Sequence, residues 1–265
     1  SCATSYATPH AAALAALTRE YFAKGLHANG PFEASAALIK ATLINSAQNI
    51  LSVEGYPNEF EGWGAVTLDR ALLFADDDPD LWIRDFRRTD AQALDVDSPS
   101  GEYELEIASN EVPLKVTLVW SDPPATNGSD SLVNDLDLDV AAPDGTTVYL
   151  GNVFNPATGE SYPGGTPDND DNVEQVLIAT PAPGTWTLRV KVGKIGLVPA
   201  DAVGQGYALV VTAKLSEPVA IPTAAKKKQR HPILDFFWMI IILMVLGIPP
   251  MVFVWKRWRS RQELN

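Results

Sequence analysis

The stretch PLKVTLVWS, residues 113–121, alternates apolar and polar side chains over most of its length. A period of two is typical of a β-strand with one face in a hydrophobic core. Five other stretches share this pattern, and the turn-forming tripeptides PDG, PGG and APG at 143–145, 163–165 and 182–184 separate several of them. The predicted strands are residues 102–108, 113–121, 136–142, 174–180, 185–192 and 207–214. We therefore expect an antiparallel β-sandwich over residues 95–215.

Acidic side chains gather in two stretches of this predicted sandwich. In NDLDLDV, residues 134–140, the carboxylates of Asp135, Asp137 and Asp139 alternate and share one strand face, where they repel unless they are solvated or neutralised. DNDDNVEQ, residues 168–175, adds further oxygen ligands of the kind that Ca²⁺ prefers. Asp and Asn also form turns, which is the alternative explanation, and no EF-hand spacing is present. The candidate calcium ligands are Asp135, Asp137, Asp171, Asn172 and Glu174.

The N-terminal stretch ATSYATPH, residues 3–10, predicts the start of a helix. Ser and Thr are preferred at this point because their hydroxyls satisfy free backbone N–H groups. The Ala-rich run that continues to Phe22 consists of strong helix formers, and its small side chains suggest a buried helix. Ser5 would then lie at the positive end of the helix dipole, where a reaction that creates an oxyanion is favoured. The alternative is that Ser5 only caps an ordinary core helix.

This N-terminal string resembles the nucleophile motif of the subtilisin-like serine proteases, the subtilases. The matching residues are Thr4, Ser5, Ala7, Thr8, Pro9 and His10, whereas Ala3 stands where the motif has Gly. ALIKATLINSAQNI (37–50) and GWGAVTLDRALLFA (62–75) resemble later segments of the same catalytic domain, in the same order. The resemblance implies that residues 1–75 are the C-terminal part of a subtilisin-like α/β catalytic domain. Ser5 would be the nucleophile, and its backbone N–H would contribute to the oxyanion hole.

The predicted sandwich resembles the jelly-roll domain that follows the catalytic domain in one branch of alkaline subtilases, and this resemblance also implies calcium. In subtilases the catalytic Asp, the His base and the oxyanion Asn precede the Ser, so an upstream part of the same protein is expected to supply them. The fragment alone should be inactive.

The function implied is a serine endopeptidase that hydrolyses polypeptide substrates through an acyl-enzyme and uses no organic cofactor. The alternative is an inactive, subtilase-derived surface protein for binding or adhesion, which the change at Ala3 and the acidic sandwich would suit.

The stretch FFWMIIILMVLGIPPMVFVW, residues 236–255, contains no charge and is long enough to cross a bilayer as a helix. Trp238 and Trp255 stand near its ends, as interfacial anchors do. We predict a single transmembrane helix over residues 233–255, after a stalk over 216–232. Residues 1–225 are then expected to be extracellular or lumenal, and residues 256–265 to form a cytosolic tail.

The charge of the chain is unevenly distributed. The 265 residues include 20 Lys and Arg and 33 Asp and Glu, a net charge of −13, and eight of the basic residues but only two of the acidic ones fall in residues 226–265. The remainder is strongly acidic, which argues against a nucleic-acid partner. Cys2 is the single cysteine, so an intrachain disulfide is excluded. With residues 76–94 as an acidic connector, the predicted fold class is multi-domain: an α/β catalytic remnant, an antiparallel β-sandwich and a transmembrane helix.

Overall fold

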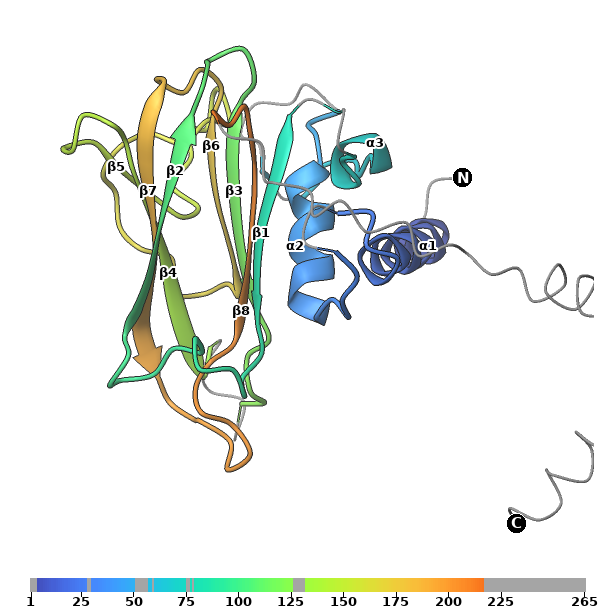
Figure 1. Ribbon diagram of the computed structural model, residues 1–265, viewed down its shortest axis with the longest axis vertical. Helices are drawn as coiled ribbons and strands as arrows, with labels where there is room; N and C mark the ends of the chain where they lie inside the picture. Colours follow the sequence, from blue (N-terminus) through green and yellow to red (C-terminus); the bar gives the residue numbers. More distant parts are fainter. Residues whose placement is uncertain are drawn as a thin grey trace, which may run out of the picture. The chain divides into compact units, whose positions relative to one another are not determined.

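Two four-stranded antiparallel sheets form the centre of the computed structural model, which describes residues 4–27, 30–50, 57–58, 60–74, 77, 79–125 and 132–216 (Figure 1). One sheet has the strand order β1-β8-β3-β6, and the other has the order β2-β7-β4-β5. The strands are β1 (Asp80–Phe86), β2 (Ser100–Ile107), β3 (Leu114–Trp120), β4 (Asn134–Ala141), β5 (Val148–Leu150), β6 (Val173–Ile178), β7 (Gly184–Ile195) and β8 (Tyr207–Ala213).

The main hydrophobic core lies between the inner faces of the two sheets. Alternate residues of β3 and β4, such as Leu118 and Leu138, point into it, because successive side chains of a strand point to opposite faces. Trp120 and Trp186 are fully buried there, one from each sheet. Each such side chain stabilises the fold by roughly 1.5–3 kcal/mol relative to an exposed position. The alternation in the sequence therefore determines which face of each strand is buried.

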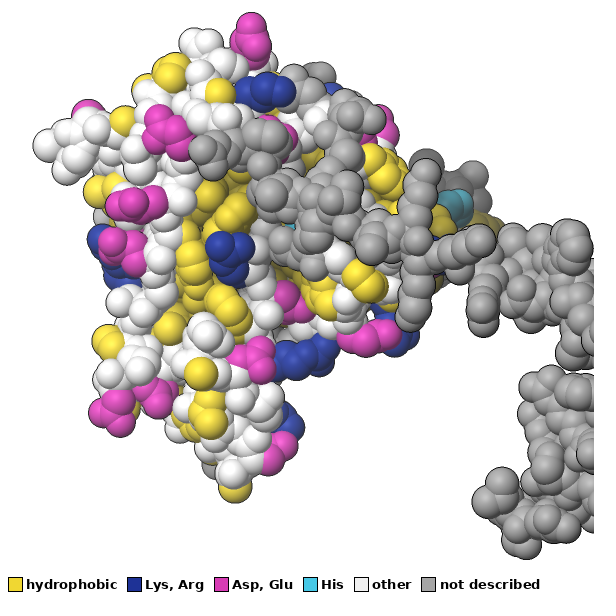
Figure 2. All heavy atoms as spheres, viewed as in Figure 1, with side chains coloured by type: hydrophobic (Ala, Val, Ile, Leu, Met, Phe, Trp, Pro, Cys, Tyr) yellow, Lys and Arg dark blue, Asp and Glu magenta, His cyan; other side chains and the backbone are white. Residues whose placement is uncertain are grey.

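An arginine closes one edge of this core. The Arg84 guanidinium on β1 lies 4.0 Å from the centre of the Trp82 ring and 5.5 Å from that of Tyr103 on β2. Cation–π contacts of this kind let a charged group cover apolar side chains. Figure 2 shows apolar atoms along this edge of the sandwich with a basic group among them.

Helix α2 (Ala36–Ser46) lies on the outer face of the β1-β8-β3-β6 sheet, and two further helices pack against α2 (Figure 1). They are α1 (Thr4–Ala23) and the short α3 (Leu68–Ala71). The N-terminus of α2 is capped by Ser35, whose Oγ accepts a hydrogen bond from the Leu38 N–H at 3.0 Å. A second buried apolar cluster joins helix residues such as Phe22 and Leu38 to sheet residues such as Val119 and Val210. The helices thus use the outer face of the sheet as their own core.

A buried asparagine fixes α2 to the strands beneath it. Asn45 Nδ2 donates to Thr117 Oγ1 on β3 at 3.1 Å and to the Val210 carbonyl on β8 at 3.3 Å. Its Oδ1 accepts from Thr212 Oγ1 on β8 at 3.0 Å. Buried polar groups are stable only when they find such partners, so Asn45 also determines the position of α2 along the sheet.

The predicted fold class is wrong. The described chain consists mostly of antiparallel sheets with few helices, and those helices pack on the sandwich instead of forming a separate α/β domain. The physical reason is that an apolar helix face must be buried, and here the outer face of the sheet buries it. A transmembrane helix is not supported either: within the described residues no helix is long and apolar enough to span a bilayer. The predicted span, residues 233–255, lies outside the described residues.

Candidate active-site serine and acidic cluster

Ser5 lies in the first turn of α1, on a part of the helix that no other described element covers. Residues 4–13 are all exposed, and Tyr6 keeps 64% of its surface accessible. The sequence predicted burial for this Ala-rich helix, and that prediction fails for its N-terminal half. The Ser5 hydroxyl is therefore accessible at the positive end of the helix dipole.

The C-terminal half of α1 is firmly anchored. Phe22 is fully buried, and its ring lies 5.3 Å from that of Phe32. The Tyr21 hydroxyl donates to the Leu73 carbonyl, which lies outside the helix. Because one half of the helix is held in the core, the exposed half with Ser5 keeps a defined direction.

Neither histidine in the described part of the chain is placed to act as a base for Ser5. His10 Nδ1 lies 2.6 Å from the Tyr6 carbonyl, and since a carbonyl only accepts, this nitrogen donates. His27 is buried, with Nε2 3.3 Å from the Leu81 carbonyl, and burial lowers its pKa. That the base comes from elsewhere in the protein stays a prediction.

The three alternating aspartates of β4 share one face of their strand, as predicted, and all are buried. Asp139 is neutralised by Lys191 of β7, whose Nζ lies 2.8 Å from Asp139 Oδ2. Asp135 and Asp137 point toward Gly193 of β7, where a Cβ would come within 2.6 Å and 3.1 Å of their Oδ2 atoms. The glycine leaves room for both carboxylates. Burial and the neighbouring Asp137 and Asp168 raise the pKa of Asp135 to about 6, and burial also raises the pKa of Asp137.

Glu174 joins this group from β6, in the opposite sheet. Its Oε2 accepts from the Leu138 N–H of β4 at 2.6 Å, and Gly151 lies so close that any Cβ there would clash with the carboxylate. Glu174 is only 1% exposed. Burial raises its pKa to about 9, although the Leu138 hydrogen bond opposes this.

The predicted calcium ligands are divided into two groups. Asp171 and Asn172 lie toward Lys40 of α2, whose Nζ donates to Asn172 Oδ1 at 3.1 Å. Asp168 belongs with the other group instead. Its charge raises the pKa of Asp135, Asp137 and Glu174, so it lies close to these three carboxylates. Asp168 Oδ2 also accepts from Asn152 Nδ2 at 2.6 Å. The sequence indicated the acidic run that contains Asp168 but not which of its members turns inward.

The fit of a cation to this acidic cluster, defined as Asp135, Asp137, Asp168 and Glu174, is partial. Asp135 Oδ1, Asp137 Oδ1 and Glu174 Oε1 are buried without a hydrogen-bond partner, which is costly unless something neutralises them. However, no group of three or more His, Cys, Asp or Glu side chains in the described ranges is arranged to hold a metal ion. The calcium prediction therefore stays a prediction.

Comparisons with known proteins point to one family. The model of the Subtilase family matches residues 2–64, a stretch that contains Ser5, α1 and α2. The serine protease/ABC transporter B family protein tagA of Dictyostelium discoideum is 27% identical over 212 residues, or 71% of this chain. The chain spans only 11% of the length of that relative. These two matches support a subtilisin-like serine protease family.

Solved structures give only remote likenesses. The lipase BlEst2 of Bacillus licheniformis in its propeptide form has a TM-score of 0.25 at 13% identity, covering 58% of this chain and 26% of the lipase. A protein of Sulfurospirillum deleyianum has a TM-score of 0.27 at 9% identity, covering 51% of this chain and 98% of that protein. Scores this low carry no argument about fold or function.

Proposed function

We propose that this chain is the nucleophile-bearing part of a subtilisin-like serine endopeptidase. Ser5 Oγ attacks the carbonyl carbon of a peptide bond in a polypeptide substrate and forms an acyl-enzyme as the amine leaves. Water then hydrolyses the ester and releases the acid. The Ser5 backbone N–H, at the start of α1, donates to the oxyanion in both steps.

One observation carries this proposal. Ser5 lies inside the stretch that matches the subtilase family, exposed in the first turn of a helix whose other half is anchored by Tyr21 and Phe22. A nucleophile must be accessible and held in a fixed direction, and this arrangement provides both.

The general base and the group that orients it come, in this proposal, from a part of the protein that precedes Ser5. His10 and His27 are both occupied by backbone carbonyls, and His27 is buried. The exposed surface of α1 around Tyr6 is where that preceding part would pack.

We assign the sandwich a supporting role, as the jelly-roll domain that follows the catalytic domain in alkaline subtilases. Its eight antiparallel strands in two sheets of four favour this assignment. The β1-β8-β3-β6 sheet supplies the surface on which α1 and α2 are fixed, so the sandwich positions Ser5 indirectly.

The test is covalent labelling of the longer protein that contains this sequence with a serine-reactive fluorophosphonate. An adduct is expected on Ser5, and Ser5→Ala should abolish it. Ser98→Ala, which changes an exposed serine in a turn of the sandwich, is the matched control and should leave labelling intact. No adduct in a folded protein would contradict the protease and favour an inactive binding or adhesion protein.

We also propose that the acidic cluster binds Ca²⁺, which would displace the proton of Glu174 and supply a counter-charge to the unpartnered buried oxygens of Asp135 and Asp137. Asp135, Asp137, Asp168 and Glu174 would supply the oxygen ligands, and the ion would contribute stability rather than chemistry. At a free concentration of about 100 Kd, Ca²⁺ should raise the free energy of unfolding by about 2.7 kcal/mol.

The calcium experiment compares denaturant unfolding in Ca²⁺ and in EDTA. Asp137→Asn should remove most of the calcium effect, whereas Asp171→Asn, outside the cluster, should retain it. Equal stability of the unmodified chain in Ca²⁺ and in EDTA would refute the site.

A further inference from the structure

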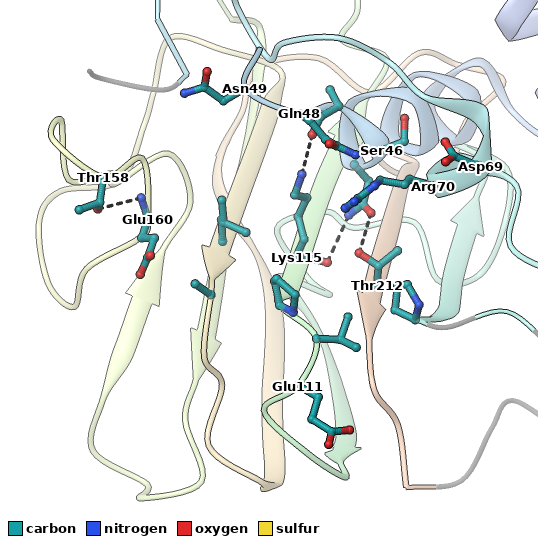
Figure 3. A pocket seen from close by; sticks show the side chains of 17 residues that line it. Ser46, Gln48, Asn49, Asp69, Arg70, Glu111, Lys115, Thr158, Glu160 and Thr212 are labelled. Atoms are coloured by element: carbon teal, nitrogen blue, oxygen red, sulfur yellow. Dashed lines mark hydrogen bonds between the residues drawn. The ribbon is translucent and has the colours of Figure 1, made fainter. Parts of the chain in front are cut away.

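A cavity of about 620 Å³ lies beside the C-terminal end of α2, away from Ser5 and from the acidic cluster (Figure 3). Its floor is the outer face of the β1-β8-β3-β6 sheet, with Lys115 of β3, Leu177 of β6 and Thr212 of β8. Arg70 of α3 and the end of α2 form its walls. The helices do not cover this part of the sheet, so the cavity is open to a ligand.

Lys115 is the main polar group on the floor. Its Nζ donates to the Ala47 carbonyl at 2.8 Å, as Figure 3 shows. An ammonium carries three N–H donors, so two remain available. Among the residues that the structure describes, no carboxylate lies within 4 Å of this ammonium.

Arg70 faces the same cavity, and no ion pair is found for its guanidinium within the described chain. Burial and the nearby charge of Arg70 lower the pKa of Lys115 to about 8. Two cations that share a cavity repel each other when neither is paired with an acid, and no salt bridge joins Lys115 or Arg70 to a described carboxylate. An anion between them would relieve that repulsion and accept the free donors.

The rest of the lining limits which anion fits. Val112 and Pro113 provide apolar surface next to Leu177. Asp69, Glu111 and Glu160 also line the cavity, and their charges disfavour a multiply charged ligand such as phosphate. A single carboxylate with an apolar group attached satisfies both conditions.

We propose that this cavity binds a small apolar carboxylate, held between Lys115 and Arg70 with its hydrocarbon part against Val112, Pro113 and Leu177. The C-terminus of a peptide and a free organic acid both have this chemistry. The inference is independent of the chemistry proposed for Ser5, since it rests on a different part of the fold.

The test is an NMR titration of the full chain with three probes. N-acetyl-leucine represents a peptide C-terminus, isovalerate represents a free organic acid, and N-acetyl-leucinamide is the uncharged control. Both acids should shift the backbone amide resonances of residues 45–49, 114 and 115. N-acetyl-leucinamide should bind at least about tenfold more weakly, because a charge-assisted hydrogen bond is lost. Tighter binding of N-acetyl-leucine than of isovalerate would identify a peptide C-terminus as the ligand. Tighter binding of isovalerate would identify a free organic acid.

Variants make the result specific to the cavity. Lys115→Met and Arg70→Gln should each weaken acid binding about tenfold or more. Lys24→Met makes the same chemical change at an exposed residue just after the end of α1 and should have no effect. Arg70 is exposed, so its variant tests the proposal even if Lys115→Met fails to fold. Equal binding of acid and amide, acid binding unchanged in Arg70→Gln, or inorganic phosphate binding more tightly than either acid would overturn the proposal.

Discussion

Glu174→Gln should change how the stability of this protein depends on pH. The pKa of the buried Glu174 is raised from its ordinary value of 4.5 to about 9. Between these two values the folded protein keeps a proton on Glu174 that the unfolded chain has lost. The folded state therefore binds more protons, and its stability falls as the pH rises. The stability that the protonated Glu174 contributes is fully present below pH 4.5 and is lost as the pH rises through about 9.

The magnitude follows from the linkage relation. One proton bound only in the folded state changes the free energy of unfolding by about 1.4 kcal/mol per pH unit. Between pH 6.5 and pH 8.0, the titration of Glu174 should therefore lower the free energy of unfolding of the unmodified protein by about 2 kcal/mol. Gln does not titrate, has nearly the same shape, and can still accept the Leu138 N–H, so this loss should disappear in the variant.

The assay is denaturant unfolding at both pH values in EDTA, followed by the fluorescence of the buried Trp120 and Trp186. Asp135 and Lys115, with pKa values of about 6 and about 8, also titrate near this range, but both proteins contain them, so the difference between the two slopes reports on Glu174. Glu104→Gln, on the exposed face of β2, should keep the slope of the unmodified protein. Identical slopes in Glu174→Gln and the unmodified protein would refute the reasoning.

Three other substitutions test the packing. Phe22→Ala should reduce the free energy of unfolding by about 3–5 kcal/mol because the ring is fully buried, while Leu17→Ala on the exposed side of α1 should change it by less than about 0.5 kcal/mol; denaturant unfolding checks both. Asn45→Ala should reduce the free energy of unfolding by about 1–3 kcal/mol, since it leaves the buried Thr212 hydroxyl without its partner, and hydrogen exchange of α2 should accelerate. Gly193→Ala should lower the melting temperature, because the added Cβ would press on Asp135; an unchanged melting temperature would contradict this contact.

Strands with alternating apolar and polar side chains were the easiest elements to predict from the sequence. The alternation at 113–121 and 185–192 predicts strands that overlap β3 and β7. Residues 80–86 lie in the stretch predicted as a connector, yet they form β1. Leu81 and Trp82 of β1 are buried on opposite faces, one under the helices and one in the sandwich core, so the strand shows no alternation. Among acidic flanking residues, such a strand resembles a linker.

The candidate site was predicted in part for similar reasons. Alternation placed Asp135 and Asp137 on one face, because strand geometry is local. The loop that carries Asp168 and Asp171 has no such period, so which side chain turns inward depends on the fold around it. Likewise, the small side chains of the Ala-rich run up to Phe22 suggested a buried helix but not which half of it is covered.

The position of β1 limits how this protein can be divided for expression or domain exchange. A fragment that begins at residue 95 would contain every other strand but leave β8 as a bare edge, because β1 is the partner on that side. It would also present Val119 and Val210 to water, with no helix above them. Exposed apolar edges of this kind recruit further strands, so such a truncation should form aggregates rather than a soluble module. A functional boundary would have to leave both the helices and β1 attached.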